Sequence, residues 1–204
     1  MAFLIALIER GGPVMWPLLL CSLLSVTIVL DRVRFWIRLR RARADDRIAG
    51  ILEHARSNAC AEAIALASGS SDAAVRVLVA GLNARASAPS EAMSTAASDE
   101  VSRMKAGLPV LDTIVTMAPL LGILGTVIGI IASFDLLGAA GIEDPKAVTG
   151  GIAQALISTA AGLTVALVTL VPFNYFVART QREAERIARA ATQLEIALGS
   201  SGAA

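Results

Sequence analysis

The sequence predicts an all-α membrane protein with three transmembrane helices and long helices that extend into the cytoplasm. Apolar residues make up 55% of the 204-residue chain, whereas soluble domains contain about 45–50%. The mean hydropathy is +0.67. No side chain is charged at neutral pH within 11–30, 113–134 or 147–178. Because about 20 apolar residues cross the hydrocarbon core of a bilayer, each interval is long enough to form a span.

The charge pattern divides the chain into spans and the segments that join them. In order, these are an interfacial helix at 1–12, a first span at 13–31, a cytoplasmic helical region at 32–110, a second span at 111–137, a periplasmic loop at 138–146, a third span at 147–178, a cytoplasmic C-terminal helix at 179–198 and a disordered tail at 199–204.

The first apolar interval is expected to be a retained span rather than a secretory signal peptide. The preceding segment, "MAFLIALIER", has no positive cluster, and no small-residue cleavage site follows the apolar run. Trp16, Phe35 and Trp36 fall near the two expected membrane boundaries, where aromatic side chains are enriched.

Arginine residues set the expected orientation. The stretch "DRVRFWIRLRRARADDR", after the first span, has seven arginines against three aspartates. Four more arginines follow the third span, whereas the loop "LGAAGIEDPKA" has two acids and one lysine. Cytoplasmic segments are rich in Lys and Arg, so the sequence predicts a multi-pass membrane protein with its N-terminus outside and its C-terminus in the cytoplasm. The arginine run adjoins a span end, which favours lipid head groups over nucleic acid as its partner.

The cytoplasmic region is expected to be a structural bundle. Short amphipathic helices are predicted around Ile51, in "CAEAIALAS" and in "SSDAAVRVLVAGLNARA", with breaks at "SGSS" and "ASAPS". Ser90 is the predicted N-cap of the next helix, which is interrupted near 107–109. The sequence has no phosphate loop and no nucleophile motif, and His54 has no Cys or His partner at ligand spacing. We therefore expect no enzyme, no cofactor and no metal site.

The third span is longer than a bilayer requires. Residues 147–178 would extend about 48 Å as one helix, whereas the hydrocarbon core is about 30 Å thick. The pattern continues through "RTQREAERIARAATQLEIAL", so we expect one continuous helix that projects into the cytoplasm. Arg182, Glu183, Glu185, Arg186 and Arg189 are expected to form its charged, solvated or inter-subunit surface.

Small residues form a stripe on each of the second and third spans. On a helical wheel they lie opposite the bulky residues Leu120, Leu124, Val127 and Ile131, and away from Leu156, Ile157, Leu163 and Leu167. The two stripes comprise Ala118, Gly122, Gly125, Thr126, Gly129 and Ser133, and Gly151, Ala155, Ser158, Thr159, Gly162, Ala166 and Thr169.

Two interpretations of these stripes remain open. In membranes, small faces let helix backbones approach closely, so the residues expected to pack helices are Gly122, Gly125, Gly129, Gly151, Ala155 and Gly162. The stripes could also line a central passage for another helix. Thr126 and Thr159 favour this, although a threonine can satisfy its hydroxyl on its own helix.

No carboxylate lies within the second or third span, although intramembrane proton relays use Asp, Glu or His. If protons cross here, another chain must supply the titrating group. Ser133, Ser158 and Gln154 are further possible polar groups of a pore, but an amide does not titrate.

The stretches "APLLGILGTVIGIIASF" and "GGIAQALISTAAGLTVALVTLVPFNYF" together resemble the paired signature of the MotA/TolQ/ExbB proton-channel family. The segment "GGPVMWPLLLCSLLSVTIVLDR" is similar to the first span of the ExbB and TolQ branch. The likeness covers the three spans, about half of the chain. Three spans rather than four make the sequence most similar to that branch.

The resemblance implies a pentameric ring of this chain around a dimer of a single-span ExbD- or TolR-like subunit. That subunit would carry the membrane aspartate, and the ring would drive a TonB- or TolA-like protein. The resemblance also implies the bacterial inner membrane, with a periplasmic N-terminus and a cytoplasmic C-terminus. The family's pore threonines correspond to Thr126 and Thr159. Gln154 stands where the family often has glutamate, which argues against a charged relay at this position.

These observations predict a proton-channel stator subunit that energises a TonB-type system for outer-membrane transport. A TolQ-like subunit of the Tol envelope-integrity system is the alternative within the family. A non-conducting membrane scaffold is the alternative from another class. A neighbouring gene for a single-span protein with a membrane aspartate would distinguish the stator from the scaffold.

Overall fold

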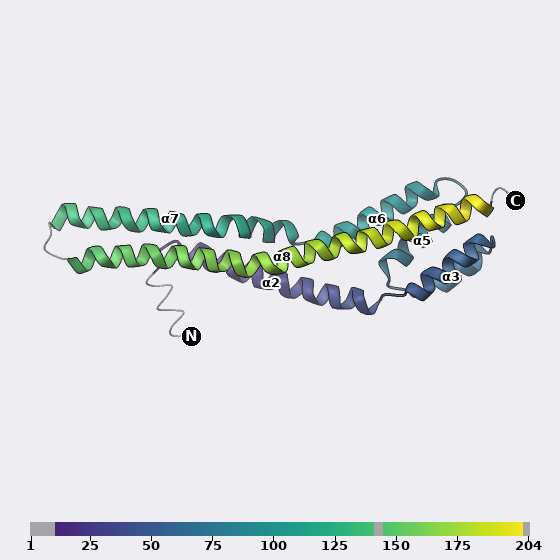
Figure 1. Cartoon of the computed structure of the whole chain (residues 1–204), viewed down its shortest axis with the longest axis horizontal. Coiled ribbons are helices and arrows are strands. Elements are labelled where there is room, and N and C mark those ends of the chain that lie inside the picture. Colours follow the sequence, from purple (N-terminus) through teal and green to yellow (C-terminus); the bar gives the residue numbers. More distant parts are fainter. Residues whose placement is uncertain (1–10, 141–144, 202–204) are drawn as a thin grey trace. The chain divides into compact units, whose positions relative to one another are not determined.

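The computed structural model describes residues 11–140 and 145–201, and all regular elements in these two ranges are helices. Figure 1 shows them along the chain. The predicted interfacial helix lies outside the described residues, apart from Gly11 and Gly12. Of the predicted periplasmic loop, 141–144 also lies outside them.

The chain divides into two compact units. The first comprises Met1–Asp31 and Gly107–Tyr175, and the second comprises Arg32–Ala106 and Phe176–Ala204. Two helices, α2 (Met15–Arg41) and α8 (Pro145–Ser201), contribute to both units.

The first unit contains α7 (Leu108–Ala140) and the first part of α8 as an antiparallel pair. Among the described residues, two helical stretches are long and apolar enough to cross a membrane: Pro89–Asp135, which comprises α6 and most of α7, and Thr149–Gly199 of α8. These cover most of the predicted second and third spans, 111–137 and 147–178, whereas the first span, within α2, stays a prediction.

The start of α2 packs on the α7–α8 pair. Met15 and Leu18 of α2 and the preceding Val14 form a buried cluster with Ala118 of α7 and Ala166 of α8. Farther along α2, Ser25 and Thr169 of α8 share a buried hydroxyl–hydroxyl hydrogen bond of 2.7 Å. Polar and apolar contacts therefore both hold α2 against α8.

A glycine separates α7 from the helix before it, as the sequence predicts. Gly107 has a φ of +78°, which a helix interior does not allow, and a Cβ there would lie 2.8 Å from Ile28. Left-handed φ and lack of space both favour glycine at this position.

The second unit is a bundle of short helices that packs on the later part of α8. The helices are α3 (Asp45–Arg56), α4 (Cys60–Ala67), α5 (Ala73–Asn83) and α6 (Pro89–Lys105). Its core includes fully buried Ile51, Leu78, Met93, Met104, Ile187 and Leu194. The prediction that Ser90 caps α6 is wrong, because Ala88 is the N-cap and Pro89 begins the helix. Proline suits that first position, since its φ is already helical and it needs no N–H partner there.

Helix α8 is a single element of 57 residues, as the periodicity predicts, with Pro172 inside it. It continues to Ser201, so the prediction of disorder from residue 199 onward does not hold for 199–201. Residues 202–204 lie outside the described part of the chain.

Candidate functional site at the α7–α8 contact

The small-residue stripes of α7 and α8 face each other at backbone distance. A Cβ on Gly122 would lie 3.0 Å from the Thr159 Cα and 3.1 Å from the Ser158 carbonyl oxygen. A Cβ on Gly129 would lie 2.9 Å from the Ala155 Cβ. The contact therefore leaves no room for a larger side chain on either helix, which is how glycine stripes join membrane helices.

The remaining glycines of the stripes also lie in this contact. A Cβ on Gly162 would meet the Ala118 carbonyl oxygen, one on Gly125 would meet the Ser158 side chain, and one on Gly151 would meet Ser133. The structure thus brings together all six residues predicted to pack helices.

Bulky residues occupy the opposite faces of both helices. They are 48–68% exposed, except for half-buried Ile157, and include Leu120, Leu124, Val127, Ile131, Leu156, Leu163 and Leu167. Each helix thus has one face closed by the other helix and one apolar face open to lipid or further chains.

The two threonines predicted to line a proton path differ in their partners. The Thr159 hydroxyl crosses the contact and donates to the Gly122 carbonyl oxygen at 2.8 Å. The Thr126 hydroxyl remains within its own helix and donates to the Ile123 carbonyl oxygen at 2.6 Å. Thr159 is therefore part of the helix contact, whereas Thr126 lies at its half-buried edge.

The two serines predicted as possible pore groups lie inside the contact. Ser158 is fully buried and donates to the Ala155 carbonyl oxygen at 2.7 Å, and Ser133, which is 3% exposed, donates to that of Gly129 at 2.9 Å. Within this chain neither serine reaches a surface that water or another helix could occupy.

Gln154 packs against the turn before α2. Its amide nitrogen occupies the space that a side chain on Gly12 would need, and Gly12 has a φ of +75°. The half-buried amide thus contacts backbone of its own chain.

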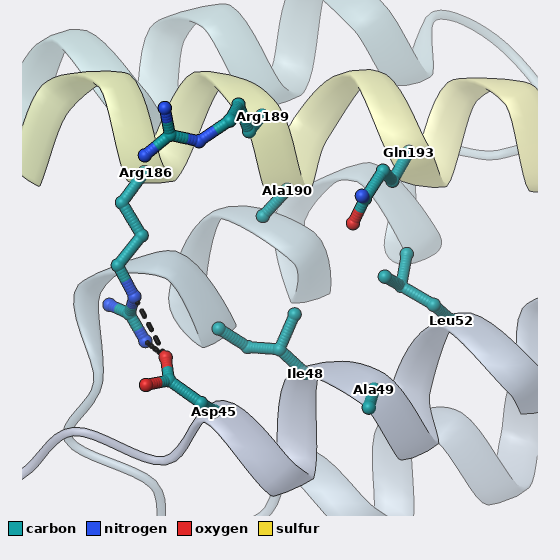
Figure 2. A pocket seen from close by; sticks show the side chains of 8 residues that line it. All are labelled: Asp45, Ile48, Ala49, Leu52, Arg186, Arg189, Ala190 and Gln193. Carbon is teal, nitrogen blue, oxygen red and sulfur yellow. Dashed lines mark hydrogen bonds and ion pairs between the residues drawn. The ribbon is translucent and has the colours of Figure 1, made fainter.

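The sequence did not reveal a buried ionic cluster in the second unit. Arg186 was predicted to lie on a charged, solvated or inter-subunit surface, but only 8% of it is exposed and its partners are in its own chain. Its guanidinium donates to Asp45 and Asp72 at 2.6 Å each, and to Glu183, also at 2.6 Å. Asp45 and Asp72 lie 141 and 114 positions away in sequence, so helical periodicity gives no sign of this pairing. Figure 2 shows the Asp45 pair.

Asp72 links three elements and is 1% exposed. It caps α5 through the Ala74 amide at 2.9 Å and accepts a second bond from the Ala44 amide at 2.8 Å. Burial alone would raise the pKa of Asp72, but Arg186 and the two amides outweigh it and lower the pKa. Burial likewise opposes the charge on Arg186, but its three carboxylate partners raise its pKa above the ordinary value.

A shallow hollow of about 310 Å³ adjoins this cluster between α3 and α8 (Figure 2). Apolar side chains such as Ile48 and Leu52 form much of its wall. Within the described ranges, no group of three or more His, Cys, Asp and Glu side chains could hold a metal ion.

Comparison with known proteins identifies the family. Residues 70–189 match the MotA/TolQ/ExbB proton channel family. Two Synechocystis sp. relatives, putative biopolymer transport proteins ExbB-like 1 and ExbB-like 3, are 36% and 34% identical to the chain. The alignments cover 92% and 91% of this chain and 76% and 90% of those proteins. The Tol-Pal system protein TolQ of Pseudomonas aeruginosa is 40% identical over 44% of this chain and 39% of its own length. The chain therefore belongs to the MotA/TolQ/ExbB proton channel family.

Proposed function

We propose that the chain is the proton-channel stator subunit of a bacterial inner-membrane motor. In this proposal a homopentamer surrounds a dimer of an ExbD- or TolR-like single-span subunit and drives a TonB- or TolA-like protein. One observation carries the proposal: α7 and α8 pair through small residues and the Thr159 hydroxyl, with no acid between Asp112 and Asp135 or between Lys146 and Arg179. The titrating carboxyl group then belongs to the partner.

Thr126 and Thr159 are the proposed lining of the proton path. Both hydroxyl protons are engaged by carbonyl oxygens, but a hydroxyl oxygen still has lone pairs that accept. A protonated partner aspartate can therefore donate to either threonine without breaking an existing bond. An ionised aspartate can only accept, so the hydroxyl must first leave its carbonyl. In this way the two threonines would distinguish the two protonation states of the partner.

The other predicted pore residues have a smaller part in this proposal. Ser133 and Ser158 are buried between α7 and α8, so we assign them to helix packing. Gln154 contacts Gly12 and cannot titrate, so we give it no proton-relay role.

We favour an ExbB-like role because the two relatives aligned over more than nine-tenths of this chain carry ExbB-like names. A TolQ-like role is the alternative, since a TolQ protein also matches. A neighbouring gene of TonB type or of TolA and TolB type would separate the two. The proposed topology places the N-terminus in the periplasm and both the region 32–110 and the C-terminus in the cytoplasm.

Cysteine labelling in intact cells tests the topology. A cysteine introduced at position 144 should react with an impermeant reagent, whereas one introduced at Ser57 should react only after lysis. Labelling of both in intact cells would contradict the proposed orientation.

Three valine variants test the proton path. Valine keeps the shape of threonine but removes the hydroxyl, so Thr159→Val and Thr126→Val should assemble with the partner yet lose most motor-dependent uptake. Thr164→Val is the matched control, because Thr164 is an exposed α8 residue whose hydroxyl donates to the Ala160 carbonyl oxygen at 2.7 Å. It should retain uptake. If Thr159→Val and Thr126→Val both assemble and support uptake at the wild-type rate, the proton path runs elsewhere.

Reconstitution distinguishes a channel from a scaffold. Vesicles that contain the chain and its single-span partner should carry a proton current when a pH gradient is applied. A stable complex without current, together with normal uptake in cells, would favour the scaffold.

A further inference from the structure

An arginine-lined hollow in the second unit has no role in the proposed proton path. It has a volume of about 770 Å³ and lies where the end of α2, the start of α3 and the loop between α4 and α5 meet. Its charged lining consists of Arg38, Arg41, Arg43, Arg47 and Asp46, which gives a net charge of +3. Gly69, Ser70 and Ser71 form part of the wall.

Most of this positive charge is not neutralised by the chain itself. Arg43 pairs with Asp45 at 3.0 Å. Arg47 donates to the Ser68 carbonyl oxygen at 3.2 Å, but no carboxylate within the described residues pairs with it. The same holds for Arg38 and Arg41, both exposed at the end of α2.

The opposite wall adds hydroxyl donors. The loop bends at Gly69, whose φ of +73° is left-handed, and then presents Ser70 and Ser71. The Ser70 oxygen accepts a bond from the Asp72 amide at 3.3 Å. Neither hydroxyl donates a hydrogen bond within the part of the chain that the structure describes. The hollow thus combines guanidinium forks and available O–H donors, a donor set suited to phosphate oxygens.

We propose that this hollow binds a phosphate-bearing anion. Guanidinium groups match the geometry of phosphate with paired N–H donors. Several arginines around one hollow favour an anion with more than one negative charge, which two sources could supply: a soluble compound with linked phosphates, or the head group of an anionic lipid.

The position of the hollow along α2 favours the soluble source for these arginines, although the arginine run as a whole was expected to contact lipid head groups. At 1.5 Å per residue, Arg38 lies about 10 Å beyond Asp31 along the helix axis, and Arg41 about 15 Å. The head-group layer on each side of a bilayer is only about 5–7 Å thick. If the first span ends at residue 31, as predicted, and α2 runs along the membrane normal, the backbone at Arg38 and Arg41 lies beyond this layer.

Titration with inorganic pyrophosphate tests the site in the full-length chain, purified in a nonionic detergent. Calorimetry should detect binding that weakens as salt is added, because partly exposed charges are screened. Arg41→Gln should weaken binding about tenfold by removing a charge-assisted contact. Arg40→Gln is the matched control, since Arg40 is exposed at the same helix end but does not line the hollow, and it should change affinity less than twofold. Asp46→Asn should strengthen binding by removing the opposing charge.

A second arm tests the lipid source in nanodiscs. Native mass spectrometry of the ejected protein should count bound phosphatidylglycerol in wild-type protein and in both arginine variants. The site would be assigned to a lipid phosphate if wild type and Arg40→Gln retain this lipid, Arg41→Gln loses it, and wild type does not bind pyrophosphate. Absence of both kinds of binding, or equal losses in the Arg40 and Arg41 variants, would overturn the proposal.

Discussion

Adding one methyl group at Gly162 tests whether backbone contact holds α7 and α8 together. In Gly162→Ala, the new Cβ would meet the Ala118 carbonyl oxygen and lie 3.0 Å from the Gly122 Cα. Both of these atoms belong to the α7 backbone, so no side chain can rotate away. The helices must separate by about 1 Å to restore ordinary van der Waals distances.

That separation also breaks the polar link beside it. The Thr159 hydroxyl would move from 2.8 Å to beyond hydrogen-bonding range of the Gly122 carbonyl oxygen. Overpacking costs about 1–3 kcal/mol, and a lost interhelical hydrogen bond costs about 0.6 kcal/mol in a membrane. The higher helix propensity of alanine returns about 1 kcal/mol. We therefore expect Gly162→Ala to destabilise the chain by about 1–2.5 kcal/mol net.

Gly150→Ala is the matched control on the same helix, because a Cβ there would have no neighbour within 4 Å. Alanine favours helix over glycine by about 1 kcal/mol, so this variant should be neutral or slightly more stable. Thermal unfolding of both variants in one detergent, followed by circular dichroism, measures the difference. Equal melting temperatures would refute the argument that backbone contact limits this site.

Three further changes probe contacts elsewhere in the chain. Asp72→Asn keeps a capping side chain but removes the charge that faces buried Arg186, and should lower the free energy of unfolding by about 2–3 kcal/mol in urea titration. The exposed control Asp99→Asn should change it little. Folding lowers the pKa of Asp72 below 3.8. The stability that the ionised carboxylate contributes is therefore present above pH 3.8 and is lost as the pH falls through the folded-state pKa. Acidification should consequently lower the free energy of unfolding less in Asp72→Asn than in wild type. Gly12→Ala should cost about 1–2 kcal/mol of stability for its left-handed φ, and a further amount because the new Cβ clashes with the Gln154 amide. Adding Gln154→Ala to this variant should relieve the clash but not the backbone strain, so the melting temperature should recover only in part.

The sequence predicts local features well because they depend on neighbouring residues. The small stripes follow from helical spacing, and the glycines at Gly122 and Gly129 lie at the contact that the wheel suggests. The continuity of α8 follows from unbroken periodicity through Pro172. The break before α7 follows from Gly107.

Features that depend on distant partners could not be predicted in the same way. Periodicity places Thr159 on the small face, but only the packed pair shows that its hydroxyl donates to Gly122. Ser25 carries no marker of its bond to Thr169, 144 positions away. Arg186 lies in a stretch of alternating charges typical of a solvated helix. Two of its three acid partners nevertheless come from distant segments: Asp45 at the start of α3 and Asp72 at the N-cap of α5.

The burial of Arg186 has a consequence for biosynthesis. Asp45 and Asp72 leave the ribosome 141 and 114 residues before their arginine partner, and the two apolar segments predicted as the second and third spans, 111–137 and 147–178, are made in between. At about 5–20 residues per second, the aspartates wait on the order of 6–30 s for Arg186. The ionic centre of the second unit therefore closes only after translation has passed both segments. A ribosome stalled before residue 186 would hold a nascent chain whose aspartates still lack their arginine.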